Sequence, residues 1–128
     1  MSLYSLYFSD HRVLLGNHRD AWVYGAADPN SFTASLLEVA RGLGSLVQSG
    51  WQPAHTIYLF SWSGEDYGLL GSTGWAELNF PEISRASSYL NVDTVVSGEY
   101  LSVSATPALA TVWEDVMEDL GPELEVRA

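Results

Sequence analysis

The chain has 128 residues, of which 47% are hydrophobic and 12% aromatic, and this composition suits one globular domain with a sizeable core rather than a disordered segment. Its net charge of −11 comes from sixteen acids against five arginines and no lysine, which argues against a nucleic-acid partner. The absence of cysteine excludes a disulfide framework and a thiolate metal site.

The sequence predicts neither a membrane span nor a secretion signal. Its longest apolar run is only a few residues, far shorter than a transmembrane helix requires. Residues 1–3 are a possible leader, and residues 4–8 are too short and lack the basic residues of a signal peptide. We therefore expect residues 1–128 to form a single, partial domain, and the compartment is left open.

Strand and helix signals alternate from the start of the chain. The apolar run within residues 12–17 predicts a buried strand. Asp28-Pro29-Asn30-Ser31 is typical of a helix start, with Asn30 or Ser31 as the cap. Apolar side chains then recur every three or four residues along one helical face, at Leu36, Val39, Ala40, Leu43, Leu46 and Val47. Gly50 and Pro53 end this helix.

The same alternation continues to the end of the chain. The remaining predicted elements are strands at 56–62 and 89–92, a possible strand at 99–104, and helices at 69–78 and 107–120. Strands that alternate with helices favour a three-layer α/β/α sandwich with a mainly parallel, mixed sheet.

Side chains that can bind a metal ion follow three of the predicted strands. They are His18, Asp20 and Asp28 after the first strand, Glu65 and Asp66 after the second, and Asp93 after the third. The carboxyl ends of strands in an α/β sheet are where ligands usually bind, and imidazole and carboxylate suit zinc and similar divalent ions. An acid after any one strand could be chance, because loops are polar, but three in succession predict a metal site.

Several segments of the chain also carry motifs that occur together in one known family. They are Gly16-Asn17-His18-Arg19-Asp20-Ala21-Trp22, Asp28-Pro29-Asn30-Ser31, Gly50-Trp51-Gln52-Pro53, Ser61-Trp62-Ser63-Gly64-Glu65-Asp66-Tyr67-Gly68-Leu69-Leu70-Gly71-Ser72-Thr73 and Tyr89-Leu90-Asn91-Val92-Asp93. With these motifs in order over residues 12 to 120, the chain resembles the M28 metallopeptidases, in the branch of glutamate carboxypeptidase II and the transferrin receptor. The resemblance implies a zinc-exopeptidase-like fold and a parent enzyme that hydrolyses a terminal peptide bond with a zinc-activated water, as a carboxypeptidase or aminopeptidase.

The resemblance assigns roles to individual residues. His18, Asp28 and Asp93 would bind one zinc, Asp28 would bridge to a second, and Asp66 would be a ligand of that second zinc. Glu65 would be the general base that takes a proton from the attacking water. Because adjacent acids on a turn can point differently, the residues alone leave open which of the pair takes which role.

Asp20 would not bind the metal itself but would orient His18 and fix its tautomer. A turn or capping acid is the alternative for Asp20, as a surface loop is for His18 and a solvated helix start is for the Glu65-Asp66 pair.

The chain also departs from the family. The second zinc of the family needs a histidine from a later strand, and the remaining histidines here, His11 and His55, stand elsewhere. Asp66 is one methylene shorter than the usual Glu, and Phe32 replaces a small Gly beside the metal-ligating loop. We therefore expect a truncated catalytic domain that binds one zinc or none and is inactive alone.

Partners and alternatives follow from the same resemblance. The parent would act on a peptide substrate, and parents in this branch are often membrane-anchored or secretory. Apolar surface left uncovered in a partial domain predicts self-association. The main alternative is a non-catalytic, transferrin-receptor-like binding or dimerisation scaffold, and a weaker one is a lyase-like or cyclase member of the superfamily.

Overall fold

The computed structural model describes residues 2–3, 11–96, 98, 101–120 and 126–127, which divide into two compact units, Met1–Val96 and Ser97–Ala128. The first unit contains all the residues to which the sequence assigned metal or catalytic roles.

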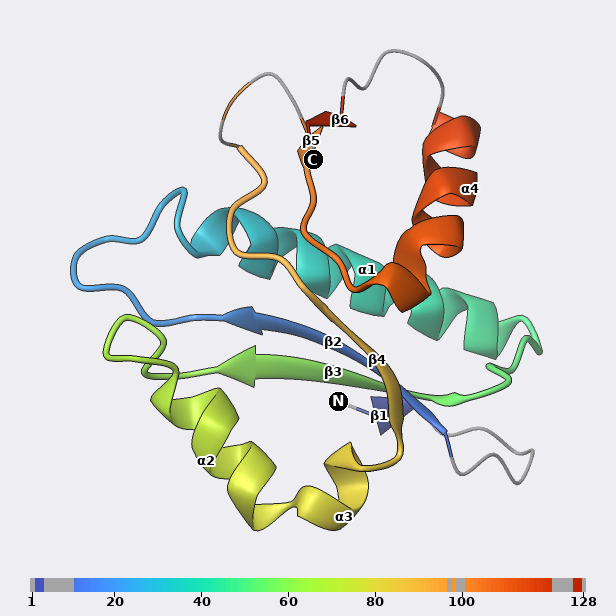
Figure 1. The fold of residues 1–128 in the computed structure, drawn as a ribbon, viewed down its shortest axis with the longest axis horizontal. Coiled ribbons are helices and arrows are strands. Elements are labelled where there is room, and N and C mark those ends of the chain that lie inside the picture. The colour runs from blue at the N-terminus through green and yellow to red at the C-terminus, as the bar shows by residue number, and fades with distance from the viewer. Residues whose placement is uncertain (1, 4–10, 97, 99–100, 121–125, 128) are drawn as a thin grey trace. The chain divides into compact units, whose positions relative to one another are not determined.

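A four-stranded sheet forms the centre of the first unit (Figure 1). Its strands lie in the order β1 (Ser2–Leu3), β3 (Thr56–Trp62), β2 (Arg12–His18) and β4 (Ala86–Asn91). β2 pairs in parallel with both β3 and β4, whereas β1 runs antiparallel to β3. The expected mixed, mainly parallel sheet is confirmed, and the carboxyl end of β2 lies between those of its two neighbours.

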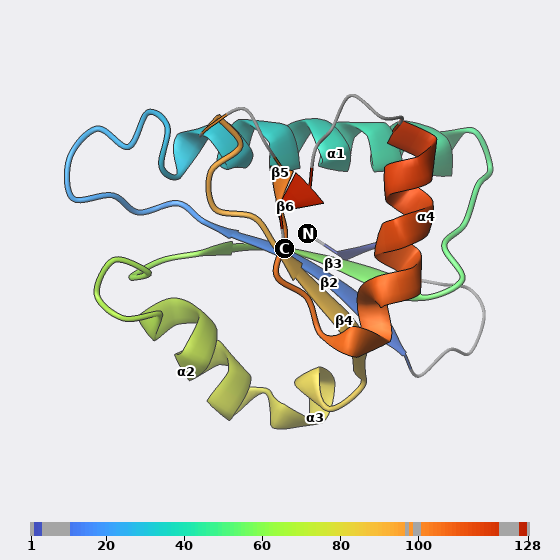
Figure 2. The same cartoon turned by 45° about the horizontal axis from the view of Figure 1, so that its top comes forward.

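Helices cover both faces of this sheet, as the two views agree (Figures 1 and 2). α1 (Asn30–Gln48) lies on one face, and α2 (Leu70–Leu78) with the short α3 (Phe80–Ile83) lies on the other. The three-layer arrangement is therefore confirmed for this unit. Two details differ from the sequence prediction, because α3 was not predicted and β4 begins at Ala86 rather than at residue 89.

Successive side chains of β3 point to opposite faces of the sheet, so this strand packs against the helices on both sides. Ile57 and Leu59 belong to the face under α1, where Leu59 packs with Phe32 and Leu36 to form the buried core. The ring of Phe32 thus fills the core. On the opposite face the rings of Phe60 and Trp62 stack with centroids 4.4 Å apart, and Trp75 of α2 packs against both. Partly buried apolar residues pack against the core under α1, namely Leu15, Ala40, Ile57 and Val92.

The second unit contains a short parallel pair and a helix. β5 (Leu101–Ser102) pairs with β6 (Val126–Arg127) and falls inside the predicted strand 99–104, of which residues 99–100 lie outside the described part of the chain. The predicted helix 107–120 begins as a 3-10 turn, Pro107–Leu109, and continues as α4 (Ala110–Leu120). Across both units, no helix among the described residues has the length and apolar character needed to cross a membrane.

The packing of the core predicts that two neighbouring leucines of α1 contribute very differently to the free energy of unfolding. Leu36 is 7% exposed and Leu37 is 68% exposed. We expect Leu36→Ala to lower the free energy of unfolding by about 2–5 kcal/mol, because it leaves a cavity in the core. The matched Leu37→Ala should change it by less than about 0.5 kcal/mol. Urea unfolding of both variants measures the contrast, and equal losses would contradict the packing described.

An ion pair at the start of β2 predicts that the stability of the fold depends on pH. Arg12 Nε of β2 donates to Glu82 Oε2 of α3 at 2.8 Å, and this hydrogen bond and the charge of Arg12 hold the pKa of the Glu82 carboxyl below its usual value. A carboxyl whose pKa is lower in the folded state stabilises the fold above its unfolded pKa, and the gain is lost as the pH falls through the folded pKa. Glu82→Gln should therefore be less stable than wild type at pH 7. In urea unfolding that difference should shrink on acidification, and a difference that does not depend on pH would contradict the ion pair.

Candidate metal centre

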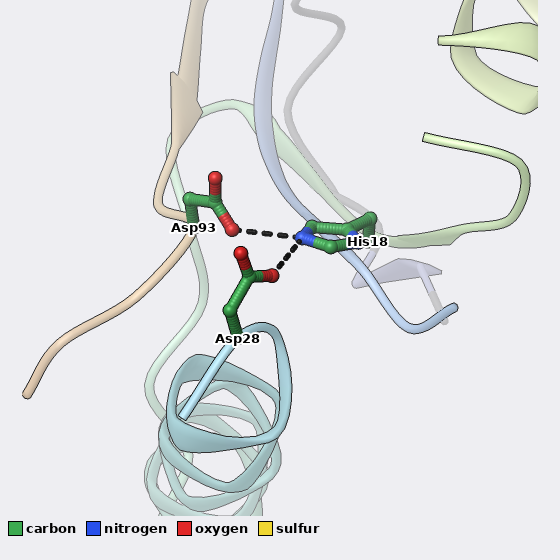
Figure 3. A group of neighbouring side chains, drawn as sticks. All are labelled: His18, Asp28 and Asp93. Carbon is green, nitrogen blue, oxygen red and sulfur yellow. Dashed lines mark hydrogen bonds and ion pairs between the residues drawn. The ribbon is translucent and has the colours of Figure 1, made fainter. Parts of the chain in front are cut away.

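Three side chains from separate segments converge at the carboxyl end of β2 (Figure 3). The imidazole of His18, the last residue of β2, is only 4% exposed. Its Nε2 lies 2.7 Å from Asp93 Oδ1 and 3.0 Å from Asp28 Oδ1, so two carboxylates lie within hydrogen-bonding distance of the same nitrogen. Both carboxylates are about half exposed, with side-chain exposures of 57% for Asp28 and 54% for Asp93. An ion from solvent could therefore reach the group.

The sheet topology produces this convergence. β2 and β4 are parallel neighbours, so the segment after β4, which carries Asp93, emerges beside His18. Backbone bonds continue the pairing past the strand ends, because Val92 N donates to Gly16 O at 3.3 Å and Arg19 N donates to Trp62 O at 3.0 Å. Asp28 lies in the loop that leads into α1, where the Pro29 carbonyl accepts the N–H groups of Phe32 and Thr33.

The negative charges of the carboxylates around His18 favour a positive charge at its imidazole or on an ion beside it. Burial lowers the pKa of the imidazole, but the hydrogen bond and charge of Asp93, together with the charges of Glu65 and Asp28, outweigh burial and raise that pKa above its usual value. A proton on His18 supplies the positive charge that the carboxylates attract. A divalent cation could supply it instead, because the three donor atoms lie within 4.8 Å of one another and form a set of nitrogen and oxygen donors that suits zinc. The residues present therefore fit a metal ion.

Asp20 supports the neighbouring loop more directly than it supports His18. The distance from Asp20 Oδ1 to His18 Nδ1 is 3.7 Å, which is too long for a hydrogen bond, and His18 Nδ1 is buried without one. The Asp20 carboxylate instead accepts the N–H of Glu65 at 3.2 Å and the N–H of Asp66 at 3.4 Å. Burial raises the pKa of Asp20, but these backbone hydrogen bonds outweigh it and lower that pKa. Asp20 thus fixes the loop that carries the acidic pair.

The two acids of that pair have different surroundings. Glu65 lines a cleft together with His18 and Asp93. Asp66 is exposed and, among the described residues, lies outside the group of possible metal ligands formed by His18, Asp28 and Asp93, which we call the metal-type group. The loop itself is tightly held. Leu69 adopts a left-handed backbone with φ of 61°, which is uncommon for a branched residue, and a Cβ at Gly71 would lie 2.3 Å from the Ser63 carbonyl oxygen.

The cleft beside the metal-type group has a volume of about 290 Å³ and an aromatic wall. Trp62 Nε1 donates to the Tyr89 hydroxyl at 2.9 Å, and that hydroxyl donates to Asn91 Oδ1 at 2.8 Å. Partial burial raises the pKa of Tyr89, so its hydroxyl stays protonated and can donate. This chain of bonds crosses β2 over Gly16, where a Cβ would lie 2.3 Å from the Tyr89 oxygen. Any side chain at position 16 would collide with the rings of Tyr89 and Trp62, which form the aromatic wall of the cleft.

The structure therefore brings together His18, Asp28 and Asp93, adds Glu65 at the cleft, and leaves Asp66 outside the group. The other histidines are exposed and stand at the opposite ends of the strands, because His11 precedes β2, His55 precedes β3, and their rings contact each other with centroids 5.8 Å apart.

Sequence reasoning missed two polar residues that adjoin His18. They are Asn17, which is fully buried, and Thr33, whose hydroxyl donates to Asn17 Oδ1 at 2.6 Å. The signal for Asn17 was an amide at the end of an otherwise apolar run. Thr33 lies on the first turns of a predicted helix, and no sequence signal distinguished it.

The chain is similar to known proteins over most of its length. The chain is 52% identical over 108 residues to a protein from Zea mays described as probable glutamate carboxypeptidase VP8, covering 84% of this chain and 15% of that protein. It is 55% identical over 101 residues to probable glutamate carboxypeptidase LAMP1 of Arabidopsis thaliana, covering 78% of the chain and 15% of the relative. It is also 44% identical over 106 residues to aminopeptidase NAALADL1 of Rattus norvegicus, covering 80% of the chain and 14% of the relative.

The chain thus spans about 15% of the length of the relatives that it matches. The model of Peptidase family M28 matches residues 6–127, which is nearly the whole chain. The sequence motifs, the α/β/α layers and the family match agree, and the chain belongs to peptidase family M28.

Proposed function

We propose that this chain supplies most of the metal-binding part of a two-zinc peptidase that hydrolyses a peptide bond at a chain terminus. The observation that carries the proposal is the position of His18 Nε2 within 3.0 Å of both Asp28 Oδ1 and Asp93 Oδ1. Family M28 consists of metallopeptidases, and the names of the relatives include both carboxypeptidase and aminopeptidase. The terminus at which the parent protein cleaves is therefore left open in the proposal.

His18, Asp28 and Asp93 would hold the first ion. Asp28 has a second carboxylate oxygen with which it could reach a second ion, and Asp66 would be a ligand of that ion after its exposed side chain turns inward. Bound zinc acts as a Lewis acid toward the scissile carbonyl and lowers the pKa of the attacking water. Among the described residues, Asp66 lies outside the group of His18, Asp28 and Asp93.

Glu65 would act as the general base. Its carboxylate lines the same cleft as His18 and Asp93, so it can face a water near the ion without being one of the three ligands. The Asp20 carboxylate would keep Glu65 in place, because it accepts the Glu65 N–H and the next one. The aromatic wall of Trp62 and Tyr89 would border the substrate on one side of the cleft.

We expect the 128-residue chain alone to be inactive. The second ion lacks a histidine, because His11 and His55 stand at the far ends of β2 and β3. The cleft is small beside the size of a peptide, so residues elsewhere in a longer parent protein would complete the substrate site.

The metal site is tested by calorimetric titration of the metal-free chain with zinc. We expect wild type to bind zinc and His18→Ala to bind it at least about 100-fold more weakly, since loss of a direct ligand should exceed the 10- to 100-fold cost of losing an outer partner. His55→Ala is the matched control, because it removes an exposed histidine remote from the site, and it should bind like wild type. Equal zinc binding by wild type and His18→Ala would refute the site.

The role of Glu65 is tested in a longer protein that contains this chain, assayed on peptides with free termini. Glu65→Gln should lower kcat by about 100- to 10,000-fold, the usual contribution of a general base, while zinc content stays unchanged. Glu77→Gln, an exposed change on α2, is the control and should leave kcat unchanged. If the wild-type longer protein shows no turnover, the non-catalytic binding scaffold becomes the better interpretation.

A further inference from the structure

Asn17 is a fully buried amide next to His18, one of the three residues of the metal-type group. It is the residue before His18 on β2, and its side chain has 0% exposure. A buried amide is costly unless its donor and acceptor are both paired. Both ends of this amide are paired, and each pairs with a different segment.

The donor end of Asn17 holds the segment that carries Asp93. Asn17 Nδ2 donates to the carbonyl oxygen of Val92 at 3.2 Å, and Val92 is the residue before Asp93. The backbone bond from Val92 N to Gly16 O, on the same residue, completes a two-point attachment to β2. Val92 therefore cannot move away from β2 without breaking both bonds, and Asp93 is held at the distance from His18 that the structure shows.

The acceptor end of Asn17 holds the start of α1. Thr33 Oγ1 donates to Asn17 Oδ1 at 2.6 Å and lies 3.3 Å from the carbonyl oxygen of His18. Thr33 N in turn donates to the Pro29 carbonyl, and Pro29 follows Asp28. One short path of hydrogen bonds thus runs from Asn17 through Thr33 to the residue that adjoins Asp28.

We propose that Asn17 and Thr33 are positioning residues for the metal ligands, and that their hydrogen bonds fix the spacing of His18, Asp28 and Asp93. The inference rests on the proposed metal site. Asn17 adjoins His18 in sequence, its donor fixes the neighbour of Asp93, and its acceptor ties in the helix that follows Asp28. Neither residue is a ligand, and their role would be to hold the ligand oxygens at a separation that suits one ion. Outer partners of this kind typically affect metal affinity by about 10- to 100-fold.

The test uses the full chain, with zinc calorimetry for affinity and the visible spectrum of bound cobalt for ligand geometry. Thr33→Val removes the hydroxyl with little change in shape, and it should weaken zinc binding about 10- to 100-fold and alter the cobalt bands at saturation. Thr33→Ser keeps the hydroxyl and should restore both the wild-type affinity and the wild-type spectrum. Ser35→Ala is the matched control, because the Ser35 hydroxyl donates to the Ser31 carbonyl within the same helix.

The saturated cobalt spectrum separates positioning from simple loss of stability, since a destabilised chain with unchanged ligand geometry gives the wild-type bands. Asn17→Ala should show a larger loss, and if it fails to fold, the Thr33 pair still decides the question. If wild type binds zinc and Thr33→Val matches it in both affinity and spectrum, the positioning role is refuted and the metal site stands. If wild type binds zinc no better than His18→Ala, the metal site is refuted, and the positioning role falls with it.

Discussion

The contact on which the site depends is that of one imidazole nitrogen with two carboxylates. His18 Nε2 can carry one proton, yet it lies at hydrogen-bonding distance from both Asp93 and Asp28. One Nε2–H cannot make a full hydrogen bond to both carboxylates. Although burial lowers the pKa of His18, the hydrogen bond to Asp93 and the charges of Asp93, Glu65 and Asp28 raise it above its usual value. The rest of the first unit can be understood as the framework that holds these three groups together, with β2 at its centre and parallel neighbours on both sides.

Much of this framework was predictable from the sequence because its signals are local. The apolar run before Asn17 and the β-branched and aromatic run of Thr56–Trp62 indicated two parallel strands, and the apolar periodicity after Asn30 indicated α1. The four-residue helix α3 was missed because four residues cannot display a helical period. The start of β4 was missed because Ala86, Ser87 and Ser88 are small residues without strand propensity.

Three members of the candidate site were predictable from the sequence, but Asp66 lies outside the group and the supports of the site were not predictable. Residue type and position at strand ends identified His18, Asp28 and Asp93, and the family resemblance supplied their roles. The orientation of Asp20 toward the backbone of Glu65 depends on how two loops meet, which no local pattern encodes. The pairing of Asn17 with Thr33 likewise joins residues on different elements. Self-association through exposed apolar side chains such as Trp22, Tyr24 and Leu78 stays a prediction.

The origin of the three ligands in separate segments has a thermodynamic consequence. His18, Asp28 and Asp93 come from the end of β2, the loop before α1 and the segment after β4, and 75 positions separate the outer two. An ion held by all three would act as a removable cross-link, because an unfolded chain offers no such preformed cage. Binding of the ion would then add to the stability of the fold, and a chelator would lower the free energy of unfolding by the same amount.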